Sequence, residues 1–177
     1  NVPVLIGRDT RISGNIIENL ISGILNYNGI DVVSAGIMPT PGLSFSLKED
    51  KYSLGIMITA SHDKAQNNGI KLFSSSGVKL DEKSEKIIES DILSQLGVLE
   101  KKENEKIGST RFKASLAKRY EYSLIERFPD LTLEKKILVD CSFGAFHSIA
   151  RKSLINFKSI NYINDKPEGK KINFKCG

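Results

Sequence analysis

Short hydrophobic runs alternate along the chain with longer segments that repeat apolar residues at helical spacing. Each run has the length of a β-strand and ends in a polar turn, and most are followed by a predicted helix. In the first part of the chain, strands are expected at 2–7, 30–35, 54–60 and 70–73. The alternation of strands and helices is typical of an α/β protein with a largely parallel sheet.

The first predicted helix extends from Ser13 to about Asn28. Ser13 is a suitable N-cap, and Asn28-Gly29 supplies a stop signal. The apolar positions of this helix are expected to face the core together: Ile16, Ile17, Leu20, Ile21, Ile24 and Leu25. A second, brief helix is expected at 43–48, after a turn in which Pro39 and Pro41 flank Thr40.

The later part of the chain shows the same alternation of predicted strands and helices. A turn at 74–77 leads to a helix that Asp81 caps, with Ile87, Ile88, Ile92 and Leu96 directed inward and Gly97 at its end. The polar segment 100–109 is expected to be an exposed connection. Beyond it, the pattern predicts a helix at 111–128, a buried strand at 135–141, a helix from Phe146 to Leu154 and a strand starting at 160–163.

These elements predict an α/β fold with two parts. Residues 1–108 would form a three-layer αβα domain with a mixed, mainly parallel sheet, and residues 109–177 the start of a second, similar α/β domain. With 177 residues and 40% hydrophobic content, the chain can bury one large core or two small ones.

Composition excludes several classes of function. The net charge is +5, from 26 Lys and Arg against 21 Asp and Glu, but the basic residues are scattered, so no nucleic-acid partner is expected. No apolar run approaches the roughly 20 residues that span a bilayer, so no membrane partner is expected. With no apolar leader after Asn1, a cytoplasmic location is expected. Cys141 and Cys176 have no metal-type spacing and are expected to be reduced.

The candidate chemistry lies in the loop that follows the strand at 54–60. Ser61 is the first polar residue after that strand, so its hydroxyl is expected at the open carboxyl edge of the sheet. A serine there can carry a phosphoryl group through a covalent intermediate. Lys71, on the next strand, can hold an anion or take up a proton. Arg8 and Arg11 follow the first strand, and a guanidinium can fork onto phosphate oxygens.

Other interpretations of this loop remain open. The consecutive residues Ser61, His62 and Asp63 suggest a hydrolase, but neighbouring residues on one backbone rarely form a triad in space, and the G-x-S-x-G motif is not present. His62 either orients the loop or transfers a proton. Ser61, taken alone, is better explained as a loop hydroxyl that caps a turn.

Three spaced segments together resemble the α-D-phosphohexomutases. Thr59-Ala60-Ser61-His62 and Asn68-Gly69-Ile70-Lys71 are similar to the phosphoserine loop of that family, and the segment GRDTRISG at 7–14 is similar to the one that supports the loop. The family usually has Asn and Pro after the Ser-His pair, whereas this chain has Asp63 and Lys64. An added carboxylate would repel a phosphoserine, and Lys64 would offset that repulsion.

The resemblance implies a set of roles. Ser61, His62 and Lys71 would be catalytic, while Arg8, Arg11 and Asn68 would bind phosphate or support the loop. The substrate would be a sugar phosphate, and the serine would be phosphorylated in the working enzyme. Mg²⁺ would bind through the phosphate on Ser61, with its other ligands in an Asp-x-Asp-x-Asp loop that this chain does not contain. A homodimer is also implied.

The resemblance covers the first domain and part of the second of what is normally a four-domain enzyme. The residues around Pro39 to Pro41 and Thr59 to Ser61 are most similar to members that interconvert glucosamine 6- and 1-phosphates. Members acting on mannose or glucose phosphates are the alternative. A further alternative is a non-catalytic binding or assembly fragment, because of Asp63-Lys64 and the end at Gly177; the 177 residues alone are expected to be inactive.

Overall fold

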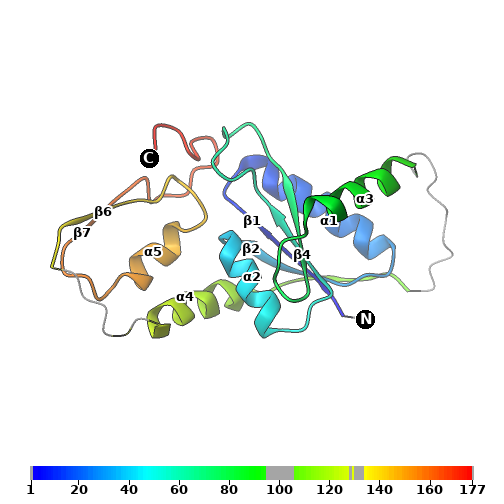
Figure 1. Cartoon of the computed structure of the whole chain (residues 1–177), viewed down its shortest axis with the longest axis horizontal. Coiled ribbons are helices and arrows are strands. Elements are labelled where there is room, and N and C mark those ends of the chain that lie inside the picture. The colour runs from blue at the N-terminus through cyan, green and yellow to red at the C-terminus, as the bar shows by residue number, and fades with distance from the viewer. Residues whose placement is uncertain (1, 95–105, 128, 130–133, 177) are drawn as a thin grey trace.

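The computed structural model describes residues 2–94, 106–127, 129 and 134–176, which form two β-sheets with helices around them (Figure 1). The larger sheet has five strands in the order β4-β3-β1-β2-β5, and the smaller has two, β6 and β7. The strand bounds are β1 Val4–Arg8, β2 Val32–Ile37, β3 Leu54–Ile58, β4 Ile70–Ser74, β5 Thr110–Phe112, β6 Ile137–Asp140 and β7 Ile160–Ile163.

The larger sheet is mixed and mainly parallel, as predicted. Strand β1 lies at its centre and pairs in parallel with both β2 and β3, and β5 extends the sheet in parallel beyond β2. Only β4 runs antiparallel, because it returns directly from β3 through the loop that contains Ser61. The carboxyl ends of β1, β2 and β3 therefore meet at one edge, next to this loop.

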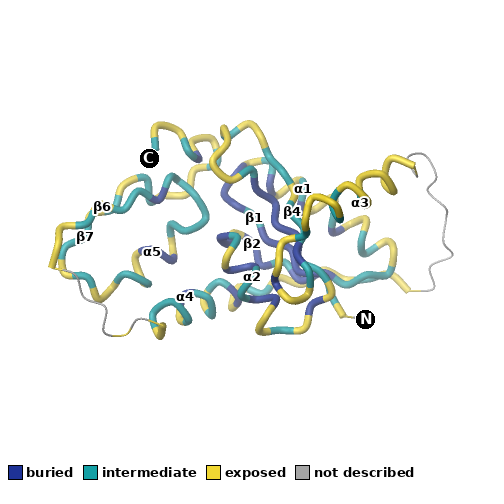
Figure 2. The backbone as a smooth tube through the Cα atoms, in the orientation of Figure 1, coloured by how far each residue is buried: buried dark blue, intermediate teal, exposed yellow. Residues whose placement is uncertain are grey.

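The side chains of β1 alternate between two cores, so the domain has three layers. The backbone of β1 is coloured as buried along most of its length in Figure 2. Leu5 is fully buried in a cluster with Leu43 and Leu47 of helix α2, Thr40–Glu49. The neighbouring Ile6 is buried in a separate cluster, against which the α1 residues Ile17, Ile21 and Leu25 pack. The predicted αβα architecture is thus confirmed for the first part of the chain.

Helix α1, Ile12–Tyr27, differs from the prediction in two respects. Its N-cap position is Arg11, which provides no side-chain cap, so the assignment of Ser13 as N-cap is wrong. Only half of the predicted apolar face reaches the core. The apolar residues form two adjacent rows with i, i+4 spacing, and the row that packs against the sheet consists of Ile17, Ile21 and Leu25. The other row is more than half exposed: Ile16, Leu20 and Ile24, together with Ile12 and Tyr27 at its ends.

Helix α3, Glu82–Ser94, follows the turn after β4. Its predicted cap is confirmed, because Asp81 Oδ1 accepts a hydrogen bond of 2.8 Å from the Ser84 N–H. The inward orientation of its apolar residues is wrong for Ile87 and Ile92, which are 55% and 57% exposed. The predicted helix end at Gly97, with Leu96, lies outside the described residues.

The segment predicted as one helix at 111–128 consists of a strand and a helix. Thr110–Phe112 forms β5, because β-branched and aromatic residues suit a strand and the edge of β2 is free to pair. Helix α4 then extends over Ser115–Arg127 and buries Leu116 completely in the α2 side of the core. The domain boundary after residue 108 stays a prediction, although β5 belongs to the first sheet. Residues 100–105 of the expected linker are outside the described residues.

The smaller sheet pairs β6 with β7 in parallel, and α5, His147–Ser153, connects them. This is the strand, helix and strand order that the sequence predicts. Strand β6 is not buried as expected, since Leu138 is 64% exposed and only one side of the two-stranded sheet is covered. Cys141 and Cys176 are free thiols. Within the described part of the chain, no helix combines the length and apolar character needed to cross a membrane.

Candidate functional site

The serine loop, residues 59–69, connects β3 to β4 at the carboxyl edge of the larger sheet. Ser61 is exposed there, as expected from its place after the strand. Its backbone has φ of 54°, in the left-handed region that side chains other than glycine rarely occupy. A conformation of this kind costs on the order of 1–2 kcal/mol and persists only where surrounding contacts hold it.

Lys71 reaches Ser61 from the neighbouring strand. In the antiparallel pairing of β3 and β4, Lys71 lies opposite Met57, a few residues before the loop. Its Nζ donates a hydrogen bond to Ser61 Oγ. The structure thus places together the two residues that sequence analysis named as phosphate carrier and cation, with the serine on the open surface.

A chain of two hydrogen bonds fixes the start of the loop to the end of β1. Asp9 Oδ2 accepts from Thr59 Oγ1 at 2.7 Å, and Thr59 Oγ1 in turn accepts from the Ser61 N–H at 3.0 Å. Asp9 and Thr59 are both buried. Sequence analysis did not assign them to the site, although each follows a buried strand at the edge where the loop was expected.

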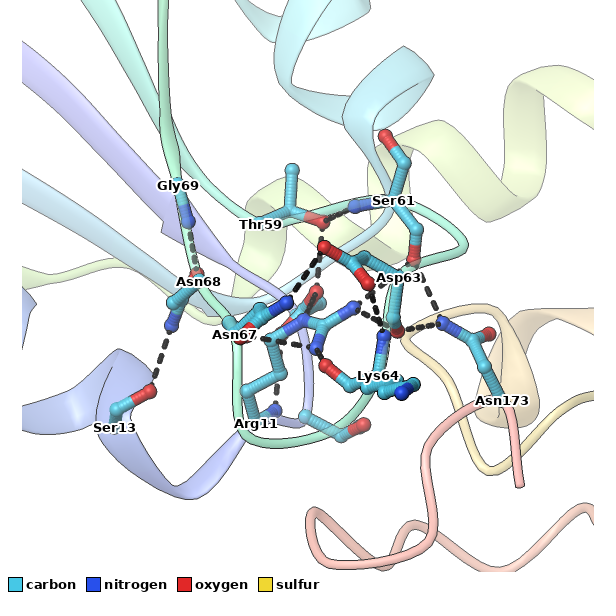
Figure 3. A network of polar contacts seen from close by, with 12 residues as sticks. Arg11, Ser13, Thr59, Ser61, Asp63, Lys64, Asn67, Asn68, Gly69 and Asn173 are labelled. Atoms are coloured by element: carbon cyan, nitrogen blue, oxygen red, sulfur yellow. Dashed lines mark hydrogen bonds and ion pairs between the residues drawn. The ribbon is translucent and has the colours of Figure 1, made fainter.

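Arg11 supports the loop with its whole guanidinium group (Figure 3). The residue is only 1% exposed, and its Nε pairs with Asp9 Oδ2 at 3.0 Å. The remaining donors reach four carbonyl oxygens of the loop, those of Ser61, Asp63, Lys64 and Asn67. A guanidinium has five N–H donors, and all five are used here. Arg11 is therefore arranged to hold the loop and has no donor left for a phosphate.

Arg8 lies apart from the serine loop. Its Nε donates to Glu18 Oε2 at 2.7 Å, and the other oxygen of Glu18 accepts from Ser34 Oγ. Glu18 is buried in α1, so this ion pair ties the end of β1 to the helix. The structure does not bring Arg8 into contact with Ser61 among the described residues.

Asn68 closes the loop at its far end. Its Nδ2 donates to Ser13 Oγ at 3.0 Å, and its Oδ1 accepts from the Gly69 N–H at 2.8 Å. Ser13 thus anchors the loop in place of capping α1. The phosphate-binding or loop-support role that sequence analysis gave to Asn68 stays a prediction.

His62 and Asp63 do not form a triad with Ser61. Asp63 accepts hydrogen bonds from the Asn67 side chain at 2.8 Å and from the Lys64 N–H at 2.7 Å, and these bonds lower the pKa of its carboxyl group. His62 is exposed and has no hydrogen-bond partner in the described part of the chain. The carboxylate at position 63, where the family usually has Asn, is thus part of the internal structure of the loop.

A residue far along the chain also contacts the loop. Asn173 Nδ2 donates to the carbonyl oxygens of Ser61 and Asp63, at 2.8 and 3.0 Å (Figure 3). Sequence analysis gave this residue no role. No local pattern could have identified it, because the contact spans 112 positions.

The described residues do not complete a metal site. No group of three or more His, Cys, Asp or Glu side chains is placed to hold an ion within the described ranges. Both oxygens of Asp9 are occupied by Arg11 and Thr59. Ser61 is exposed, so a phosphate on its hydroxyl has room to provide one oxygen ligand.

Comparisons with known proteins agree with this geometry. The sequence profile described as phosphoglucomutase/phosphomannomutase, alpha/beta/alpha domain I, matches residues 1–96. A phosphoglucosamine mutase of Prochlorococcus marinus is 38% identical over all of this chain and 39% of its own length. One of Francisella philomiragia is 39% identical over 98% of this chain and 39% of its own length. The chain therefore spans about two fifths of these relatives.

Solved structures show the same fold. A phosphoglucomutase/phosphomannomutase family protein of Burkholderia thailandensis superposes with a TM-score of 0.77 at 20% identity, over 96% of this chain and 37% of that protein. A Thermus thermophilus protein gives a TM-score of 0.74 at 24% identity, over 94% of this chain and 38% of its own. The profile match covers more than half of the chain and includes the whole serine loop. The chain thus belongs to the phosphoglucomutase/phosphomannomutase family, and its residues 1–96 are the α/β/α domain I of that family.

Proposed function

We propose that the chain is the phosphoserine-bearing part of a phosphosugar mutase that interconverts glucosamine 6-phosphate and glucosamine 1-phosphate. The observation that carries the proposal is the exposed Ser61 hydroxyl, held on a strained backbone and contacted by Lys71 Nζ. A serine in this setting is accessible to a substrate, and its orientation is fixed by the loop. Both properties are needed for a residue that accepts and donates phosphate.

The proposed reaction has two phosphoryl transfers. In the first, the bond between phosphorus and Ser61 Oγ breaks, a bond forms to the free hydroxyl of the hexosamine phosphate, and that hydroxyl loses its proton to a base. The product is a bisphosphate, which turns over in the site. In the second, the other phosphate returns to Ser61 and its sugar oxygen regains a proton, so that the net reaction is an isomerisation.

The residues of this chain have separate parts in that scheme. Lys71 would hold the phosphate on Ser61 by charge and hydrogen bonding. His62, exposed beside the serine, is a candidate for proton transfer. Arg11 and Asn68 keep the loop in place and do not contact substrate in this scheme. Arg8, paired with Glu18, stabilises the end of β1 next to the site.

Mg²⁺ is the metal that we propose for this site, on the basis of the family. When bound, it would neutralise charge on the phosphate of Ser61. The described residues supply a single ligand position, through Ser61, and therefore do not fit a complete magnesium site. No step of the scheme above is assigned to the metal.

The choice of sugar rests on the relatives. The sequences that are 38% and 39% identical to this chain are named phosphoglucosamine mutases. This favours glucosamine phosphates over mannose or glucose phosphates. Because the chain spans about 39% of those relatives, the activity is proposed for a protein that includes further sequence, and the 177 residues alone are expected to give no turnover.

The proposal is tested with the protein extended by its downstream sequence. Interconversion of the two glucosamine phosphates is measured for the wild type, for Ser61→Ala and for Ser75→Ala. Ser75 is the matched control because it is an exposed serine in the turn after β4. We expect Ser61→Ala to lose turnover to the detection limit and Ser75→Ala to keep it. Undiminished turnover in Ser61→Ala would refute the mechanism.

A further inference from the structure

The side-chain amide of Asn173 donates hydrogen bonds to two of the carbonyl oxygens that Arg11 also contacts. Arg11 Nη2 donates to the carbonyl oxygens of Ser61 and Asp63 at 3.2 and 2.9 Å. Asn173 Nδ2 donates to the same two oxygens from the other side of the loop. An amide nitrogen has two N–H groups, so one can serve each carbonyl. Because both partners are carbonyls, which only accept, the nitrogen of the amide must face them.

The contact is built by the second part of the chain. Asn173 has φ of 62°, and its N–H donates to Ser142 O at 3.1 Å. Ser142 is itself held in the left-handed region by a 2.8 Å bond from its N–H to Asp140 Oδ1, at the end of β6. The backbone of Asn173 is thus held by the turn that follows β6.

Two further contacts bring this part of the chain close to the end of β1. Thr10 Oγ1 donates to Phe143 O at 2.7 Å. Gly169 approaches so closely that a Cβ atom on it would lie 2.3 Å from Thr10 O, nearer than real contacts allow. Only glycine fits there, and the segment from 169 to 173 therefore lies directly against the turn that leads into Arg11.

The two hydrogen bonds from Asn173 affect the orientation of the Ser61 side chain. The Ser61 carbonyl belongs to one of the two peptide planes that set the direction of the Ser61 side chain, and the Asp63 carbonyl fixes the chain two residues further on. The left-handed backbone of Ser61 needs such external support. A small rotation of these planes would move Oγ away from Lys71 and from a substrate, and small misplacements are costly in phosphoryl transfer.

We infer that Asn173 is a positioning residue that holds the serine loop in its transfer-competent conformation. It acts through the backbone of Ser61 and Asp63 and touches neither the reacting atoms nor the phosphate. The inference rests on the proposed function for its effect on catalysis. Its effect on the loop is independent of that function, because it follows from the hydrogen bonds alone.

Asn173→Asp is the variant that tests the inference most sharply. Aspartate has the same shape and also tolerates a left-handed backbone, so packing and folding are preserved. The ionised carboxylate has no donor and would face two carbonyl oxygens. At pH 8 we expect amide hydrogen exchange to rise at least about threefold in residues 61–67 of the 177-residue chain, and to stay unchanged in β3.

The kinetic test uses the extended protein and the same variant. We expect kcat to fall about tenfold at pH 8, with KM changed less than about twofold, because the loop and not the binding of sugar is affected. As the pH falls toward 4, where an aspartate of ordinary pKa is about half protonated, the introduced carboxyl gains a proton that it can donate to one of the two carbonyls, so the variant should recover in part relative to the wild type. A residue needed only for folding would not give this recovery.

Asn161→Asp is the matched control, since Asn161 is exposed on β7, away from the loop. It should leave loop exchange and kcat unchanged. Unchanged loop exchange in Asn173→Asp would overturn the inference even if the enzyme is a mutase. A wild type without mutase activity would overturn the proposed function, while the exchange experiment would still decide whether Asn173 holds the loop.

Discussion

The two parts of the molecule differ in how they are stabilised. The five-stranded sheet has a buried cluster on each face, with α1 on one and α2 and α4 on the other. The two-stranded sheet has few buried side chains of its own: Cys141, Ile149, Ala150 and, beyond β7, Ile172 (Figure 2). Most of the buried apolar side chains therefore belong to the larger sheet and its helices. The second part nevertheless supplies Asn173, which donates hydrogen bonds to the serine loop. Most of the buried core thus lies in the first part, while the loop is held by residues of both parts.

The largest difference between the two parts is expected for arginine substitutions. Arg11→Met would leave the loop carbonyls of Lys64 and Asn67 without their side-chain donor and would remove the cationic partner of buried Asp9. We expect a loss of about 3–5 kcal/mol in the free energy of unfolding. Arg151→Met is the control in the second part. Its guanidinium pairs with Asp165 but its side chain is 57% exposed, so we expect a loss below about 1 kcal/mol. Urea unfolding measures both, and equal losses would contradict the comparison.

Leucine truncations give the next largest contrast. Leu47→Ala removes a side chain that is 2% exposed in the α2 cluster, and about 2–4 kcal/mol should be lost. Leu138→Ala in β6 removes one that is 64% exposed, and the change should stay within about 0.5 kcal/mol. Thermal unfolding of the two variants measures the difference. A large loss at Leu138 would show that the smaller sheet has a tighter core than its exposure indicates.

Acid should weaken the junction between α2 and α4. Burial alone would raise the pKa of Asp50, but hydrogen bonds from Arg119 and Lys113 outweigh it, so that the pKa is lowered in the folded chain. The stabilisation is therefore complete above the unfolded pKa of about 3.9 and is lost as the pH falls through the lower folded value. Asp50→Asn should cost about 1 kcal/mol at pH 7 and progressively less as the pH falls below about 3.9. Urea unfolding at several pH values checks this, and a cost that persists in acid would refute it.

The smallest effect is expected at Asp63. Its carboxylate is exposed next to Ser61, and Asp63→Asn keeps an oxygen for the Lys64 N–H while removing the charge. The steady-state fraction of phosphorylated Ser61 should rise by about two- to threefold, since exposed charges interact weakly. Quantitative mass spectrometry of the loop peptide measures the change. A fall in phosphorylation would mean that the carboxylate supports the loop more than it repels the phosphate.

The fold of the first part could be predicted from sequence because its signals are local. Apolar runs, turn residues and the polar start of the serine loop define β1, β3 and β4 to within two residues at each end. The orientation of α1 could not be predicted, because rows of isoleucine and leucine lie on two adjacent stripes and Glu18 occupies the buried side with Arg8 as partner. Nor could β5, which pairs only because the edge of β2 is free.

For the candidate site, sequence analysis identified the reacting groups better than their supports. Ser61 and Lys71 lie together as expected from two strands joined by one loop. Arg11 was named as a phosphate or loop residue, and only the structure shows that the loop uses all of its donors. Asn173 could not be found, because its contact with Ser61 depends on how the second part of the chain packs against the first.

The central claim is that the Ser61 hydroxyl carries phosphate between two positions of one sugar. The most direct measurement is the mass of the serine-loop peptide after the extended protein is incubated with hexosamine 1,6-bisphosphate, the proposed intermediate. The account predicts one added phosphate on Ser61 and its loss when glucosamine 6-phosphate is supplied. A serine that stays unmodified while the protein turns over substrate would contradict it.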